Sequence, residues 1–102
     1  MSRYTVYITP RAWRETRDLP GNMRQRVKRA IDALADDPLP PSSKKLDIRE
    51  FECDVRRLRL EKWRVVYAVN DADNIVDVLA VRKRPPYDYR DLDRLLRESR
   101  NL

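Results

Sequence analysis

The sequence predicts one α+β domain in the order β-α-α-β-β-β-α, with a small, twisted, mainly antiparallel sheet. Side chains alternate at the start of the chain and again between residues 52 and 82, which is the period of strands. Apolar residues at helical spacing fill residues 20–34 and recur at the end of the chain. With 102 residues the chain suffices for one core and not for two, so residues 1–102 are expected to form a single domain.

The first half of the chain is expected to supply one strand and two helices that cover one face of the sheet. Residues 3–8 alternate as a strand does. Thr9 is a suitable N-cap for a first helix with Pro10 at its first position, and Trp13 is expected in the core. A second helix begins at Pro20, and its apolar face consists of Met23, Val27, Ala30, Ile31 and Leu34.

The second half is predicted to be mostly strand. Residues 37–43 contain three prolines and form a connector. Residues 52–60, 63–70 and 74–82 are rich in β-branched and aromatic residues and suggest an antiparallel meander, with turns at residues 61–62 and 71–73. Residues 88–102 are expected to form a short amphipathic helix with Leu92, Leu95, Leu96 and Leu102 on one face.

Composition excludes several classes of protein. The chain has no histidine, one glycine and one cysteine, so imidazole catalysis, glycine-rich phosphate loops, zinc fingers and internal disulfides are all ruled out. We therefore expect neither a metal nor a small-molecule cofactor. The formal net charge of +6 favours an anionic partner.

The sequence also bears on location. It contains no run of about 18 apolar residues, and its first strand-like stretch is too short and polar for a signal peptide. A lone cysteine, Cys53, agrees with a reducing compartment. We expect a soluble, cytoplasmic protein with no membrane partner.

Arginines gather on one face of the predicted hairpin. A two-residue turn at 61–62 pairs Arg59 with Arg64 and places Arg57 on the same face. Directly opposed like charges are unfavourable unless an anion lies between them, so the pattern indicates an anion site. The opposite face is expected to pack on the helices, and it carries Leu58, Leu60, Trp63, Val65 and Tyr67.

The register of the next hairpin decides whether more arginines join this face. If Val69 pairs with Ile75, Arg64 lies opposite Ala80. Arg82 and Arg84 follow Ala80 at two-residue spacing, so they would lie on the same face as Ala80. A loop one residue shorter would turn them away, because such a slip moves every side chain of a strand to the other face.

The arginines in question are Arg82 and Arg84, and tyrosines follow them directly. Two stiff prolines at 85–86 set the direction in which Tyr87 and Tyr89 project. Guanidinium groups that hold phosphates and aromatic rings that stack on bases are typical of single-stranded RNA recognition. The alternative is an ordinary solvated face, since arginine outnumbers lysine 18 to 5 along the whole chain.

Two segments carry a family resemblance that extends over nearly the whole chain. Residues 57–67 read RLRLEKWRVVY, and the tail at residues 82–89 reads RKRPPYDY. Together with the order of elements, these motifs resemble the RelE/ParE toxin superfamily, and the tail resembles the RelE branch. The resemblance implies a RelE-like fold and a ribonuclease toxin that cuts messenger RNA in the ribosomal A site. It also implies a cognate antitoxin that neutralises the toxin.

The resemblance carries over to individual residues. It implies that Arg64 and Arg84 are catalytic, together with Tyr89 or Tyr87, since the prolines alter the spacing. The resemblance implies Arg57 and Arg59 as substrate-binding residues, and we also expect Arg82 and Lys83 to bind the substrate. The chain departs from the family at Val55, where well-known members often have lysine, and this leaves one positive charge fewer.

A metal-free reaction is consistent with this composition. Attack of the ribose 2′-OH on the adjacent phosphate needs a base, stabilisation of a more anionic phosphorane and protonation of the leaving 5′-oxygen. Tyr89 is the candidate base, because nearby guanidiniums favour its phenolate. Two alternatives remain open: a ParE-like toxin that inhibits DNA gyrase, and an RNA-binding module without catalysis.

Overall fold

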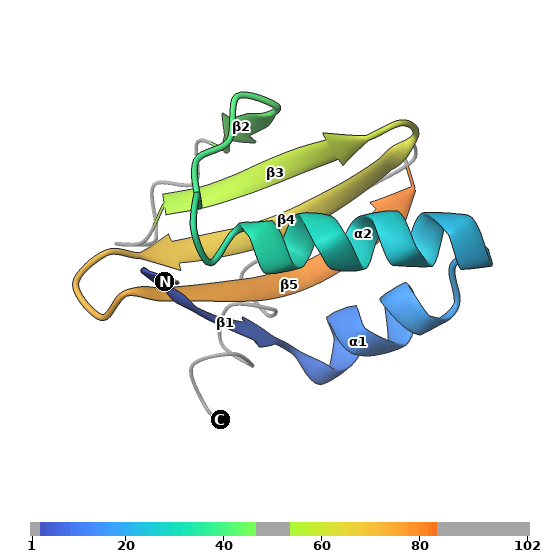
Figure 1. The fold of residues 1–102 in the computed structure, drawn as a ribbon, viewed down its shortest axis with the longest axis horizontal. Coiled ribbons are helices and arrows are strands. Elements are labelled where there is room, and N and C mark those ends of the chain that lie inside the picture. The colour runs from blue at the N-terminus through green and yellow to red at the C-terminus, as the bar shows by residue number, and fades with distance from the viewer. Residues whose placement is uncertain (1–2, 47–53, 84–102) are drawn as a thin grey trace.

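Two helices and five strands are formed by the residues that the computed structural model describes, 3–46 and 54–83 (Figure 1). The predicted α+β fold and order are confirmed, except that the sequence did not predict β2. The predicted helix over residues 88–102 lies outside the described residues. The elements are β1 (Thr5–Ile8), α1 (Pro10–Arg17), α2 (Gly21–Ala33), β2 (Ser43–Lys45), β3 (Asp54–Leu60), β4 (Trp63–Asn70) and β5 (Ile75–Lys83).

The strands form one sheet in the order β1-β5-β4-β3-β2. β1 runs parallel to β5, and the other neighbours are antiparallel, so the sheet is mainly antiparallel as predicted. Neither described helix is long and apolar enough to span a membrane.

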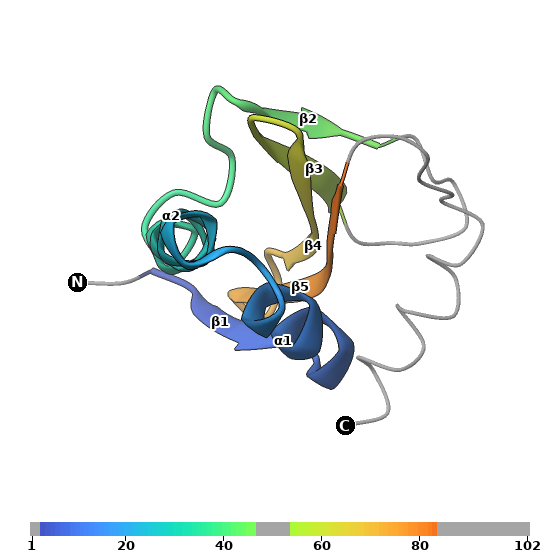
Figure 2. The same cartoon turned by 90° about the vertical axis from the view of Figure 1, so that its right-hand side faces the viewer.

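Both described helices lie on one side of the sheet (Figure 2). The core forms between them and one face of β3, β4 and β5, where Leu58, Val65 and Tyr67 pack with Val27 and Ile31 of α2. This is the face that the alternation predicts. The arginine positions of β3 and β4 therefore lie on the side of the sheet away from the described helices.

Helix α1 is fixed directly to β5. Thr9 is its N-cap, as predicted, and the Thr9 Oγ1 accepts a hydrogen bond from the Ala12 N–H at 3.2 Å. The Thr9 N–H donates to the Val78 carbonyl at 3.1 Å, and its hydroxyl donates to the Leu79 carbonyl at 3.4 Å. The prediction that Trp13 is buried is wrong: α1 turns Ala12 and Thr16 inward and leaves Trp13 52% exposed.

The proline-rich connector is tied to the sheet by Tyr67. The Tyr67 hydroxyl donates to the Pro38 carbonyl at 2.8 Å, and burial raises the pKa of this phenol. Ser43 donates to the Pro40 carbonyl at 2.7 Å and accepts from Arg56 Nε at 3.1 Å. These bonds hold the connector so that β2 forms beside β3.

Candidate nucleic-acid interface

The β3–β4 hairpin has the predicted register. Its turn consists of Glu61 and Lys62, so Leu60 pairs with Trp63 and Arg59 pairs with Arg64. Glu61 adopts φ 56°, the positive value that the first position of a tight hairpin turn requires in one common turn type. Arg59 and Arg64 are therefore direct cross-strand neighbours on one face.

The β4–β5 hairpin differs from the predicted register in two places. Its turn is one residue shorter than expected, so Asn70, and not Val69, pairs with Ile75. Within the turn, the Asn70 side chain accepts from the Asp73 N–H at 3.2 Å and donates to its carboxylate at 3.1 Å. By itself this shorter turn would move the later arginines of β5 to the other face.

A β-bulge restores the face. The register shifts again between Val66 and Tyr67, because Leu79 is an extra residue on β5. The shorter turn and the bulge each shift the register by one residue, which makes two residues together. The side chains of β5 beyond the bulge therefore point to the same faces as in the predicted register. As a result Arg64 lies opposite Arg82 and not opposite Ala80.

The two hairpins together create a row of arginines across three adjacent strands, which we call the arginine row: Arg59 of β3, Arg64 of β4 and Arg82 of β5. Adjacent strands lie about 4.8 Å apart, so the three side chains leave the sheet side by side. Arg57 and Lys44 are paired with each other two residues along the same face, and they extend the basic surface toward β2. Such a surface fits a chain of phosphates.

Arg64 is the most deeply placed member of the row. It is 3% exposed, and its guanidinium donates to the Glu61 carbonyl at 3.0 Å and to the Trp63 carbonyl at 3.1 Å. Arg59 is exposed, and its Nε donates to the same Glu61 carbonyl at 3.4 Å. The tight turn therefore anchors both guanidiniums at one end of the hairpin.

Arg82 is held at the other side of the row by α1. Its Nε lies 3.7 Å from the Glu15 carboxylate, whose other oxygen accepts the Val81 N–H at 3.2 Å. This contact lies at an open groove of about 560 Å³, which is also lined by Asp18, Leu19, Trp63 and Lys83. Lys83 pairs with Trp63 and so projects from the opposite face to the arginine row.

The structure thus brings together four predicted residues, Arg57, Arg59, Arg64 and Arg82, and separates Lys83 from them. Arg84, Tyr87 and Tyr89 lie outside the described residues, so their roles stay predictions. Val55 is 1% exposed and shares the face of Arg57. Within residues 3–46 and 54–83, no cluster of three potential metal ligands is present.

Two polar residues of this region were not found from the sequence. Lys44 joins the basic face only through β2, a three-residue strand with no clear sequence pattern. Glu15 is the one acidic residue of α1, among three arginines, and that isolation is the signal that the sequence offered.

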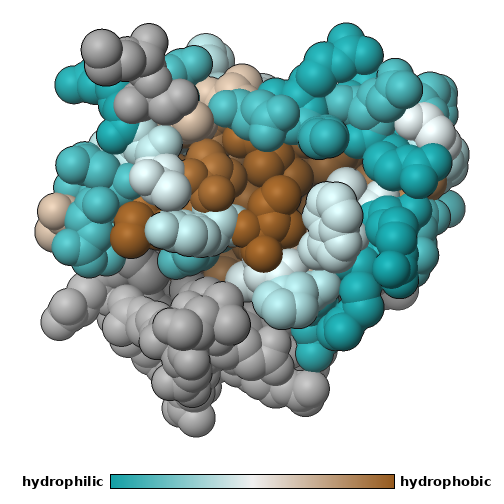
Figure 3. Space-filling view, turned by 60° about the horizontal axis from the view of Figure 1, so that its bottom comes forward, coloured by the Kyte–Doolittle hydropathy of each residue, from teal (hydrophilic) through white to brown (hydrophobic). Residues whose placement is uncertain are grey.

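A second notable surface lies on the helix side of the molecule. An apolar pocket of about 230 Å³ opens between α1 and α2, with Ile8, Trp13 and Ile31 in its walls. Figure 3 shows apolar side chains gathered in the middle of one face, with hydrophilic ones above them and to both sides. The remaining lining residues are Thr16, Arg17, Arg24, Lys28 and Asp32, so cations outnumber carboxylates at the rim.

The α+β fold is that of RelE-like toxins, and comparison with known proteins identifies the family. The model of the ParE toxin of type II toxin-antitoxin systems matches residues 6–85, so the chain belongs to this family. A Methanocaldococcus jannaschii protein named as toxin RelE1 is 30% identical over 84 residues, which are 80% of this chain and 91% of that protein. An Escherichia coli protein named as a RelE-like toxin is 33% identical over 86 residues, which are 84% and 88% of the two chains.

A solved structure shows the same fold in a complex. The archaeal RelE–RelB complex from Pyrococcus horikoshii contains a chain that superposes with a TM-score of 0.74 at 27% identity. The match covers 83% of the present chain and 99% of that chain. The protein is therefore a toxin of a type II toxin-antitoxin system.

Proposed function

We propose that this toxin is a ribosome-dependent endoribonuclease that cuts messenger RNA in the A site and so inhibits translation. The arginine row is the observation that carries the proposal. Three guanidiniums from three adjacent strands lie at one position of the sheet, where like charges that face each other across the strands repel. Bound phosphate removes that repulsion.

The row supplies one part of the chemistry. Guanidiniums bind phosphate oxygens through fixed, forked donors and interact more strongly as the phosphate gains charge in the phosphorane. They are poor proton donors because a guanidinium keeps its proton at the pH of the cell. Proton transfer is therefore assigned to Tyr89 or Tyr87, with Arg84 beside the phosphate, as the family resemblance implies. A site that lacks imidazole depends on the ribosome to orient the message for in-line attack.

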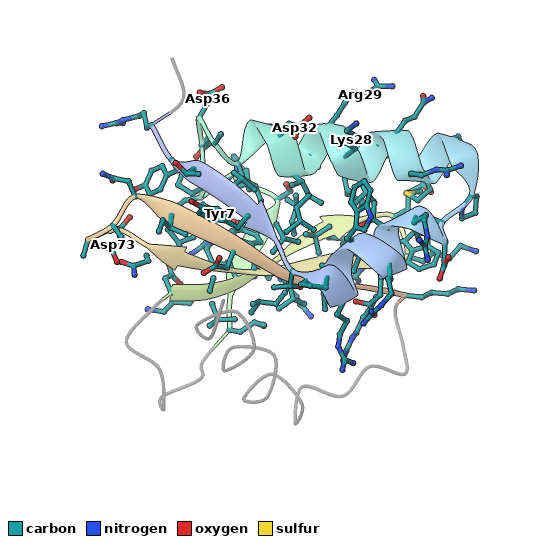
Figure 4. The ribbon with its side chains drawn as sticks, turned by 90° about the horizontal axis from the view of Figure 1, so that it is seen from below. Tyr7, Lys28, Arg29, Asp32, Asp36 and Asp73 are labelled. Carbon is teal, nitrogen blue, oxygen red and sulfur yellow. The ribbon has the colours of Figure 1, made fainter. Side chains whose placement is uncertain are left out.

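Induction of the toxin in the absence of antitoxin tests the proposal. We expect growth arrest, with primer extension showing cuts inside codons of translated messages. Arg82→Ala should reduce cutting, whereas Arg29→Ala should not, since Arg29 lies on α2 and points away from the sheet (Figure 4). Translated messages that stay intact in arrested cells would contradict the proposal.

One specific observation favours a second function. The family model that matches the chain describes ParE toxins, and the family resemblance implies DNA gyrase as the target of that branch. This candidate predicts arrest with broken chromosomal DNA and intact messages. A gyrase-directed toxin has no need of the arginine row, so Arg82→Ala would leave its toxicity unchanged.

We further propose a cognate antitoxin that anchors an acidic, amphipathic segment in the pocket between α1 and α2. An apolar side chain would fill the pocket beside Trp13, and neighbouring carboxylates would face Arg17, Arg24 and Lys28. This pocket lies on the helix side of the sheet, away from the arginine row. Neutralisation should therefore be separable from toxicity by mutation.

Co-expression with the antitoxin tests this docking site. Trp13→Glu should arrest growth even when the antitoxin is present, because a carboxylate at the pocket repels the acidic segment. Leu39→Glu is the matched control, since Leu39 is exposed to the same degree, 51%, and lies away from the pocket. The docking site is wrong if the antitoxin neutralises the Trp13 and Leu39 variants equally well.

A further inference from the structure

The Glu15 carboxylate bridges the backbone of β5 and the arginine row. One oxygen accepts the Val81 N–H at 3.2 Å, and the other lies 3.7 Å from Arg82 Nε. Both charged side chains are largely buried, with 28% of Glu15 and 20% of Arg82 exposed. A carboxylate thus lies beside one member of a basic site.

The contact with β5 explains the position of Glu15 but not its charge. β1 pairs with β5 only as far as Val78, and α1 follows β1 directly. Beyond that point the buried Val81 N–H needs an acceptor, which Glu15 supplies. The amide oxygen of glutamine would serve equally well for this bond. The negative charge acts instead on Arg82.

We propose that Glu15 is a positioning residue that holds the Arg82 guanidinium at the β5 end of the arginine row. This inference rests on the proposed ribonuclease function. Glu15 accepts a hydrogen bond from the Val81 backbone, so its ion pair with Arg82 fixes the position of the Arg82 side chain relative to β5. Arginine has five N–H donors in a fork, so one guanidinium can contact a carboxylate and a phosphate at the same time.

The charge of Glu15 has two opposed effects. It attracts Arg82 into place, which favours the strongly anionic transition state, where correct placement has its largest effect. It also repels the phosphates of RNA before reaction. Removal of the charge should therefore tighten RNA binding and slow the cutting step, a combination that simple damage to the fold does not produce.

Glu15→Gln in the full-length toxin is the test, because glutamine keeps the acceptor for Val81 and loses the charge. On ribosome-bound message we expect kcat to fall about tenfold while KM stays equal or decreases. Binding of a single-stranded oligoribonucleotide should tighten about twofold at low salt, from Coulomb's law for one unit charge roughly 8 Å from a phosphate in water.

The Arg82→Ala background separates positioning from structure. If Glu15 acts through Arg82, Glu15→Gln should no longer change kcat once Arg82 is absent, whereas the roughly twofold tightening of RNA binding, which comes from direct repulsion of phosphate, should persist. An equal loss of kcat in both backgrounds overturns the proposal, as does an unchanged kcat in the wild-type background. Glu15→Ala, which removes the Val81 acceptor as well, should lower Tm, whereas Glu15→Gln should not.

These experiments distinguish failure of the Glu15 proposal from failure of the proposed ribonuclease function. If the wild-type toxin leaves ribosome-bound message intact, the proposed function fails and with it the catalytic part of this inference. The oligoribonucleotide measurement then still decides whether the charge of Glu15 acts on bound RNA. Equal affinities of wild type and Glu15→Gln would overturn that part too.

Discussion

The charge of Arg59 should cost folding stability, so its removal should make the protein more stable. Arg59 is exposed and directly opposite Arg64, and its one described hydrogen bond is a long contact of 3.4 Å with the Glu61 carbonyl. Arg59→Gln keeps a polar side chain of similar length and removes the charge. We expect this variant to unfold at a higher temperature than the wild type.

The size of the effect follows from the sheet geometry. At the roughly 5 Å spacing of adjacent strands, two unit charges repel by about 0.8 kcal/mol in a water-like dielectric and by about 3 kcal/mol at an effective dielectric constant of 20. Long side chains splay apart, and opposed like charges typically cost about 0.2–1 kcal/mol. For a domain of this size, such a gain corresponds to a rise in Tm of roughly 1–8 °C.

Thermal unfolding followed by circular dichroism measures this shift. Arg29→Gln is the control, because it lowers the net charge of +6 by the same unit and lies on α2, away from the row. The gain of Arg59→Gln over Arg29→Gln should be present at low salt and small at about 1 M salt, where charges more than about 3 Å apart are screened. A gain no larger than that of Arg29→Gln would refute the argument, as would a gain independent of salt.

The remaining predictions concern the fold and the tail. Tyr67→Phe should lower the free energy of unfolding by about 1–2 kcal/mol, because the buried Pro38 carbonyl loses its donor. Burial raises the folded-state pKa of Tyr67, so its stabilising effect should be complete below pH about 10 and lost at higher pH; alkaline denaturation curves of wild type and Tyr67→Phe should therefore converge. Thr9→Ala removes the cap of α1 and should cost about 1–2 kcal/mol in urea unfolding, and a change below about 0.3 kcal/mol would contradict the assigned cap. Arg84→Ala should slow single-turnover cleavage about 100-fold or more with a much smaller loss of ribosome binding, and Tyr89→Phe should slow it more than Tyr87→Phe; the reverse order would exchange the tyrosine roles.

The periodic parts of the sequence predicted the fold well. Alternation in β3 and β4 identified the face that packs on the helices, and the two-residue turn fixed the pairing of Arg59 with Arg64. The apolar stripe of α2 was similarly clear, since Met23, Val27 and Ile31 are all buried. These features depend on local spacing, which a sequence displays directly.

The features that the sequence did not predict depend on contacts between distant segments. The shorter β4–β5 turn and the bulge at Leu79 shift the register by one residue each, and no local pattern fixes either one. The exposure of Trp13 follows from the angle at which α1 meets β5, and apolarity alone does not reveal that angle. Likewise, Glu15 meets Arg82 across 67 positions of the chain, so only the folded arrangement identifies the pair.

The central claim is that the arginine row acts on the phosphates of ribosome-bound message. The most direct test is the kcat/KM for cutting of a defined message in a reconstituted translation reaction, compared between Arg82→Ala and Arg29→Ala. We expect at least a tenfold decrease for Arg82→Ala and a value within twofold of wild type for Arg29→Ala. Equal values for the two variants would contradict it and would leave the arginine row without a role in the reaction.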